Sequence, residues 1–144
     1  MNLVIGYGNP LRRDDGAGPE VARRIEALGL PDVQVIEAHQ LLPEHAEPLS
    51  RADRAIFVDA TVEEGATSVE VRPIHPRADA SLAAHASDPE ALLAVALLLF
   101  DHTPDSWLVT IPGTNFSLGE SLTPETLQAC SQATKIVKKL AEQK

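Results

Sequence analysis

The sequence predicts a single α/β domain of three layers, in which a twisted, mostly parallel sheet of about five strands lies between helices. Two observations lead to this prediction. Short apolar runs alternate with segments of helical periodicity in the order β-α-β-α-β-β-α-β-α, which is typical of parallel sheets covered on both faces. The chain has 144 residues, enough for one core but too few for two, so we expect residues 1–144 to form one domain.

The first half of the chain supplies three of the predicted strands. The apolar run 2–6 predicts the first strand. A Gly-rich turn leads from it to a helix over 19–28, which has a proline in its first turn and a glycine just past its end. Residues 33–37 and 54–59 predict the second and third strands, and a short helix is expected near Pro43 between them.

The second half adds two strands and two helices. Residues 68–72 alternate in the manner of a half-exposed strand, and 107–111 predict the last strand. Residues 87–90 read as a capping box that opens an apolar helix over 88–100. We expect this helix to be buried, because its apolar run is too short to span a membrane. Thr123 is expected to cap a final helix.

Composition and charge exclude several kinds of partner. The net charge of -9 and the pI of about 4.9 argue against nucleic acid and against anionic membranes. The lone Cys130 cannot form an internal disulfide and is typical of a reducing compartment. No basic start or long apolar stretch precedes Gly6, so we expect no signal peptide and a cytoplasmic location.

The Gly-rich turn after the first strand is the most informative segment. It reads Gly6-Tyr7-Gly8-Asn9-Pro10-Leu11-Arg12-Arg13-Asp14-Asp15-Gly16-Ala17-Gly18. Leu11 stands where a dinucleotide-binding turn needs its third glycine, and the Gly-Lys-Ser/Thr of a phosphate-binding loop is missing. The adjacent carboxylates Asp14 and Asp15 favour a cation over an anion at this turn.

Three residues from different strand–helix connections are candidates for a metal site. Ligands of parallel sheets bind beyond the carboxyl ends of the strands, where Asp15, Asp59 and His85 are all expected. Two carboxylates and one imidazole suit Zn²⁺, Ni²⁺ or Fe²⁺ better than Mg²⁺ or Ca²⁺, and three ligands leave positions open for substrate or water.

Simpler roles stay open for each of these residues. Asp15 could satisfy backbone N–H groups within the turn, Asp59 could cap the connection after its strand, and His85 could be an ordinary loop histidine. Asp14 is expected to face solvent as the partner of a neighbouring arginine. Cys130, on the apolar stripe of the last helix, is expected in the core, because nothing near it in the sequence would activate a thiol.

The ordered motifs of the chain resemble those of the hydrogenase maturation proteases, the endopeptidases that trim the C-terminus of the [NiFe]-hydrogenase large subunit. The matching residues are Gly6-x-Gly8-Asn9-x-Leu11-x-x-Asp14-Asp15-Gly16-x-Gly18, Gln40-Leu41, Phe57-Val58-Asp59-Ala60, His85 before a Leu-rich helix, and the Pro112…Phe116…Gly119-Glu120…Leu122 stretch. The resemblance extends from about Leu3 to Val137 and is closest to the forms that serve soluble, bidirectional hydrogenases. Arg13 departs from it, because many relatives carry glycine there.

The resemblance implies a twisted sheet of about five strands between helices, and it also implies roles. Asp15, Asp59 and His85 would contact a nickel ion that belongs to the client, so no resident cofactor is expected. Asp15 or Asp59 would hold or deprotonate the attacking water, which makes the expected activity an aspartic-type endopeptidase. The residues expected to shape the substrate cleft are Gly6, Gly8, Asn9 and Gln40; Asn9 could also donate to a developing oxyanion, or simply stabilise the turn.

The implied function is removal of a C-terminal extension from the nickel-loaded precursor of a [NiFe]-hydrogenase large subunit, by a protein that acts as a monomer. One alternative is a non-catalytic nickel-sensing or chaperone protein for the same client. A small-molecule hydrolase or phosphorylase is the third class considered. It would need a cationic phosphate or sugar pocket, and the Asp14–Asp15 pair argues against one.

Overall fold

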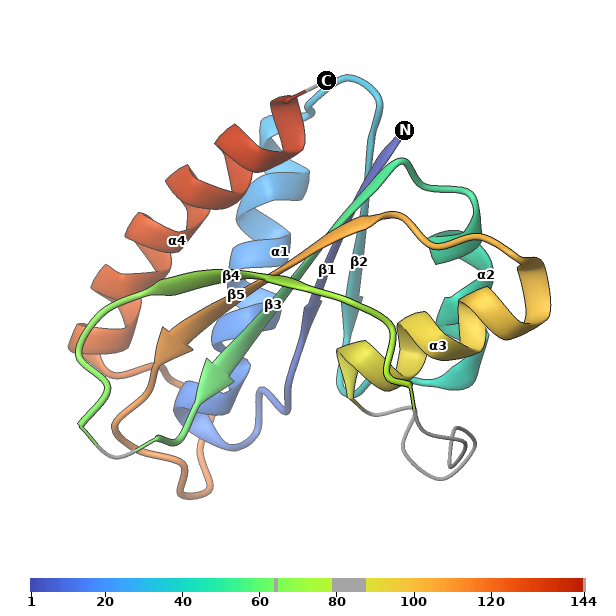
Figure 1. The fold of residues 1–144 in the computed structure, drawn as a ribbon. Helices are drawn as coiled ribbons and strands as arrows, with labels where there is room; N and C mark the ends of the chain where they lie inside the picture. The colour runs from blue at the N-terminus through green and yellow to red at the C-terminus, as the bar shows by residue number, and fades with distance from the viewer. Residues whose placement is uncertain (64, 79–87, 144) are drawn as a thin grey trace.

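The computed structural model describes residues 1–63, 65–78 and 88–143, and it has one five-stranded sheet with the strand order β2-β1-β3-β5-β4 (Figure 1). The strands are β1 (Asn2–Tyr7), β2 (Val33–Ala38), β3 (Arg54–Thr61), β4 (Glu70–Ile74) and β5 (Asp105–Pro112). All neighbours are parallel except β4, which runs antiparallel to β5 at one edge. The predicted α/β class and the order of the elements are confirmed.

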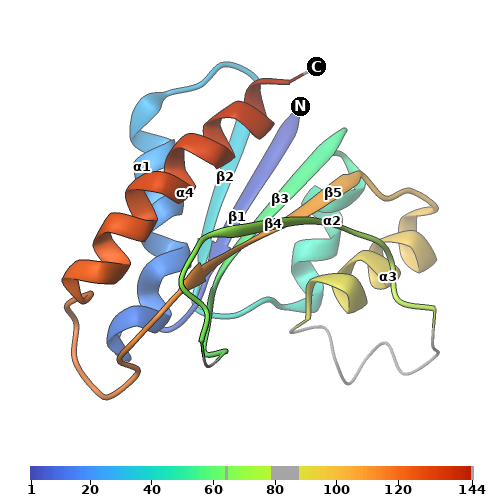
Figure 2. The same ribbon diagram turned by 60° about the vertical axis from the view of Figure 1, so that its left-hand side comes forward.

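Helices cover both faces of this sheet. The helices are α1 (Ala17–Leu28), α2 (Ala46–Ser50), α3 (Pro89–Phe100) and α4 (Pro124–Glu142), with short 3₁₀ turns at Arg13–Gly16 and Pro43–His45. Figures 1 and 2 show α1 and α4 together on one face and α2 and α3 on the other. No helix in the described part of the chain is long and apolar enough to cross a membrane.

Two apolar cores result, one on each face. Along β1 and β3 successive side chains point to opposite faces, so Leu3 and Phe57 join α2 and α3, whereas Val4 and Ile56 join α1 and α4. This double burial explains why the central strands read as continuous apolar runs rather than alternating ones. Cys130 is fully buried in the α1/α4 core, as its position on the helical stripe predicted.

Two predictions about α3 were wrong. The N-cap is Asp88 rather than the first residue of the predicted capping box: its Oδ1 accepts hydrogen bonds from the backbone N–H of Glu90 at 2.8 Å and of Ala91 at 3.4 Å. The predicted cap, Ser87, lies outside the described residues. The helix is also buried only over residues 91–96, because just these turns pack against α2 and the sheet; Leu98 in the last turn is 70% exposed.

Other helix and strand boundaries differ from the predicted ones by a few residues. The half-exposed strand begins at Glu70, two residues after the predicted start, and the first helix begins at Ala17 because the 3₁₀ turn before it leads directly into it. The final helix starts as expected: the Oγ1 of Thr123 accepts a hydrogen bond from the backbone N–H of Thr126 at 3.4 Å.

Candidate active site

A contact between two glycines brings the Gly-rich turn to the ends of the strands. A Cβ on Gly18 would collide with the carbonyl oxygens of Tyr7 and Val58, and a Cβ on Gly6 would collide with the carbonyl oxygen of Gly18. The first turn of α1 therefore lies directly on β1 and β3, at an approach that only glycine permits. The segment just before α1 is thereby held at the carboxyl edge of the sheet, the edge at which the parallel strands end.

Within this turn Asp15 is held by the backbone. Its Oδ2 accepts a hydrogen bond from the N–H of Asn9 at 2.7 Å, and the Oδ1 of Asn9 accepts one from the N–H of Leu11 at 3.0 Å. Asn9 thus stabilises the turn, which favours that role over oxyanion binding. The other carboxylate oxygen of Asp15 has no hydrogen-bond partner in the described part of the chain, so it is available to a ligand.

Asp14 points the other way, and the prediction that it faces solvent was wrong. Its carboxylate is fully buried and accepts hydrogen bonds from the backbone N–H groups of Thr114, Asn115 and Thr123, at 2.9, 3.0 and 2.8 Å. The hydroxyl groups of Thr114 and Thr123 also donate to it. Burial by itself raises the pKa of Asp14, but these hydrogen bonds outweigh it and hold the pKa at about 2.

These contacts bind the Gly-rich turn to the loop after β5. The backbone N–H of Arg13 donates to the carbonyl of Gly119 at 2.9 Å, and the Nε of Arg12 donates to the carbonyl of Phe116 at 3.1 Å. Arg13 has a φ of 46°, in the left-handed region that favours glycine, the residue that many relatives were expected to carry there. Its guanidinium donates to the Oγ of Ser121 at 3.0 Å, a contact that a glycine could not make.

Asp59 lies half-buried at the same edge, two residues before β3 ends at Thr61 rather than at its predicted end, and it is close enough to Asp15 for their charges to interact. Burial raises the pKa of Asp59 to about 6; the negative charge of Asp15 raises it too, whereas the hydroxyl of Tyr7 and the backbone N–H of Ala60 partly offset the rise. Two of the three predicted site residues, Asp15 and Asp59, are therefore brought together.

Tyr7 is a site residue that the sequence analysis missed. It is buried, and both burial and the charge of Asp59 raise the pKa of its hydroxyl, which therefore stays protonated as a hydrogen-bond donor. A signal was available in the sequence. Tyr7 is the last residue of β1, and Asp59 lies near the end of β3; the alternation of the two strands puts both side chains on the α2/α3 face.

The remaining predicted residues are only partly accounted for. His85 lies outside the described residues, so the proposed trio of ligands stays a prediction; within the described ranges no group of three or more His, Cys, Asp or Glu side chains could hold a metal. Gly8 has a φ of 148°, and a Cβ there would collide with the carbonyl of Asp15. The N–H of Gly8 donates to the carbonyl of Ala38 at the end of β2, at 3.1 Å. Gln40 lies exposed just after this strand, and the role of Gln40 in substrate binding stays a prediction.

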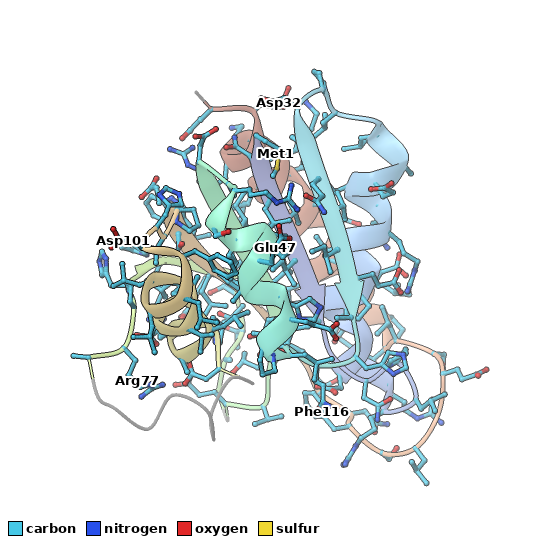
Figure 3. All side chains as sticks on the ribbon, turned by 90° about the vertical axis from the view of Figure 1, so that its right-hand side faces the viewer. Met1, Asp32, Glu47, Arg77, Asp101 and Phe116 are labelled. Atoms are coloured by element: carbon cyan, nitrogen blue, oxygen red, sulfur yellow. The ribbon has the colours of Figure 1, made fainter. Side chains whose placement is uncertain are left out.

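The volume of a cavity does not identify the candidate active site in this fold. A cavity of about 670 Å³ lies at the opposite edge of the sheet, where the strands begin, and is lined by residues such as Met1, Asp32 and Arg54. Figure 3 shows Met1 and Asp32 at that edge and Phe116 at the other end of the molecule. Its carboxylates are already paired: Asp32 and Asp53 with the Met1 ammonium, Asp105 with Arg54, and Glu142 with Lys138, so this cavity lacks a free carboxylate such as that of Asp15.

Comparison with known proteins adds the class of fold. No protein-family model matches the chain, and no curated protein is similar enough to it in sequence to count as a relative. Solved structures match over almost the whole chain. The [NiFe] hydrogenase maturation protease HycI from Thermococcus kodakarensis KOD1 matches with a TM-score of 0.74 and 20% identity, over 99% of this chain and 93% of that one.

Two further structures agree. The hydrogenase 2 maturation peptidase from Thaumarchaeota archaeon SCGC_AB-539-E09 has a TM-score of 0.72 and 22% identity, over 97% of each chain. The hydrogenase maturating endopeptidase HybD from E. coli has a TM-score of 0.70 and 23% identity, over 95% of this chain and 89% of that one. The molecule is an α/β protein with paired carboxylates at the carboxyl edge of its sheet. Its fold is that of the hydrogenase maturation proteases.

Proposed function

We propose that this protein is an endopeptidase that removes a C-terminal extension from the precursor of a [NiFe]-hydrogenase large subunit. The observation that supports this most directly is the pairing of Asp15 and Asp59, in unequal environments, at the carboxyl edge of this fold. The order of the motifs along the chain agrees with it. The activity belongs to the aspartic type, because both catalytic groups are carboxylates.

Asp59 and Asp15 have different roles in the proposed hydrolysis. Asp59, whose pKa is raised to about 6 by burial and by Asp15, accepts the proton of the attacking water, because a base is most effective when its pKa lies near the working pH. Asp15 orients that water through its unpaired oxygen while Asn9 fixes the other one at 2.7 Å. The buried hydroxyl of Tyr7 keeps Asp59 in place.

Nickel enters as part of the substrate. Asp15, Asp59 and His85 contact the nickel of a loaded client, and the protein itself holds no resident cofactor. Two carboxylates and one imidazole leave coordination positions open, so the site inspects the metal without removing it from the client. The client is the precursor large subunit of a soluble, bidirectional hydrogenase, and the protease acts on it as a monomer in the cytoplasm.

A processing assay tests this proposal. Nickel-loaded and nickel-free precursor are each incubated with the protein, with the Asp15→Asn variant and with no addition, and the mass of the large subunit is measured. We expect loss of a C-terminal peptide from the loaded precursor alone, and at least about a hundredfold slower loss with Asp15→Asn.

The other outcomes are equally informative. Cleavage of both precursors would retain the protease and overturn the recognition of nickel. Stable binding of this protein to the precursor without a change in the precursor's mass would overturn the endopeptidase in favour of a chaperone for the same client. The precursor used must be one that is known to be competent for processing. Unchanged cleavage by Asp15→Asn would overturn the role given to that carboxylate.

A further inference from the structure

A groove beside Asp59 has no role in the mechanism above. It has a volume of about 420 Å³ and is lined by side chains of β3, β4 and β5 and of the chain just after β3, among them Thr61, Glu63, Glu70, Arg72 and Thr110. β4 is the edge strand next to β5 (Figure 2), and it supplies Glu70 and Arg72 to the lining. Val71 and Leu108 are its apolar lining residues, and the others are polar or charged.

The register of the strands connects this groove to the catalytic carboxylate. Asp59 on β3 is paired with Thr110 on β5, and Thr110 is paired with Glu70 on β4. The next inward-facing row is Phe57, Leu108 and Arg72. Paired residues of neighbouring strands point to the same face of a sheet, and Phe57 and Leu108 both lie in the α2/α3 core, so Asp59 and the groove share that face.

The distance along this row sets the number of peptide residues that span it. Neighbouring strands lie about 4.8 Å apart, so the Cα of Glu70 is about 10 Å from that of Asp59, two strands away. An extended peptide advances about 3.3 Å per residue. A chain that crosses the row from Asp59 therefore reaches Glu70 after about three residues.

The charge of the groove is negative. Glu63 and Glu70 are both exposed, and neither forms an ion pair with any other described residue. Arg72, the basic residue of the lining, is already 3.7 Å from Glu90, with which it is paired. A positively charged side chain that entered the groove would thus meet two available carboxylates.

We propose that this groove binds an extended segment of the client, and that Glu63 and Glu70 recognise a Lys or Arg side chain about three residues from the scissile bond. This inference rests on the proposed function, because it makes the groove a continuation of the catalytic site. A second copy of this chain is a poor occupant, since each copy carries a net charge of -9. The groove then selects the client by charge, and Asp59 accepts the proton of the water that cleaves it.

The test is kinetic. Cleavage of the nickel-loaded precursor is measured against precursor concentration for the unmodified protein, for Glu63→Gln with Glu70→Gln, and for Glu26→Gln, an exposed glutamate of α1, as the matched control. We expect KM to rise about tenfold for the double variant with kcat nearly unchanged, and no change for the control. Circular dichroism verifies that each variant is folded.

A charge exchange makes the test specific. Replacing the client's basic residue near the third position by Glu should raise KM to a similar extent, and Glu70→Lys should restore cleavage of that altered client. An unchanged KM for the double variant, or a client with no basic residue within about four positions of the cut, overturns the inference while the protease stands. Absence of cleavage by the unmodified protein overturns the proposed function and the inference with it.

Discussion

The adjacent residues Asp14 and Asp15 have opposite roles in the molecule. Asp14 turns inward and accepts hydrogen bonds from two loop residues and from the N-cap of α4, Thr123. Asp15 turns towards the strand ends and keeps one oxygen unpaired within the described residues. Because both lie in one short 3₁₀ turn, the inward carboxylate fixes the direction of the outward one. Asp14 is therefore a structural anchor of the site, and Asp15 is available for chemistry.

The loss of the Asp14 charge should cost stability. In Asp14→Asn the amide would present N–H groups to buried donors, and we expect the free energy of unfolding at pH 7 to fall by about 2–4 kcal/mol. The folded pKa of about 2 lies below the ordinary value of 3.8, so the stabilisation from Asp14 is present above about pH 4 and is lost as the pH falls to 2.

Urea unfolding at pH 7 and pH 2.5 measures both effects. The variant should lose less stability than the unmodified protein between these two pH values. Asp101→Asn, a change at an exposed residue past the end of α3 that has a φ of 56°, serves as the control, because asparagine tolerates that backbone conformation. Equal acid sensitivity of Asp14→Asn and the unmodified protein would contradict the role of Asp14 as an ionised anchor.

At the scale of the elements, α3 differs most from what its composition suggests. It is apolar on every side, yet only residues 91–96 are buried. The residues of its last turn, Leu97, Leu98, Leu99 and Phe100, are between 44% and 70% exposed. A helix that is apolar all round is normally enclosed, but this one extends beyond the core on which it packs.

Substitutions along α3 should therefore differ sharply. Leu93→Ala opens a cavity at a fully buried position and should lower the free energy of unfolding by about 2–5 kcal/mol. Leu98→Ala, at a position that is 70% exposed, should change it by less than about 0.5 kcal/mol. Denaturant titrations of both variants compare the two effects directly. Similar losses would mean that the last turn is covered in solution.

At the scale of the whole molecule, one sheet separates two cores but also joins them. β1 and β3 contribute alternate side chains to both cores, so neither core can open without breaking strands that the other requires. The carboxyl edge of the sheet depends on both layers: Asp59 faces the α2/α3 side, whereas the Gly-rich turn is held by α1 and by the loop before α4. The whole chain is thus expected to behave as one unit.

Residues 1–144 should therefore unfold in a single cooperative step. The fluorescence of Trp107, the one tryptophan, which lies in β5, should follow the sheet, and far-UV circular dichroism should follow the helices. In urea the two signals should give the same midpoint. A separate early transition in the circular dichroism would contradict this and would identify a layer that unfolds alone.

Local patterns were sufficient for the fold and for part of the site. Apolar runs, the cap at Thr123 and the glycines of the turn act over a few residues, so the order of strands and helices follows from the sequence. Asp15 and Asp59 could be assigned to one edge because parallel strands end together. His85 was assigned by the same reasoning and lies outside the described residues, so its role stays a prediction.

Tertiary structure alone decided the rest. Asp14 faces inward because its donors, Thr114, Asn115 and Thr123, come from a loop about a hundred residues further along the chain. The raised pKa of Asp59 depends on its burial and on the charge of Asp15, and the exposed end of α3 depends on where the sheet and α2 stop. The sequence by itself determined which segments form strands and helices and which carboxylates reach the common edge. The environment of each carboxylate required the folded chain, because electrostatics and packing depend on neighbours in space that periodicity along the sequence does not encode.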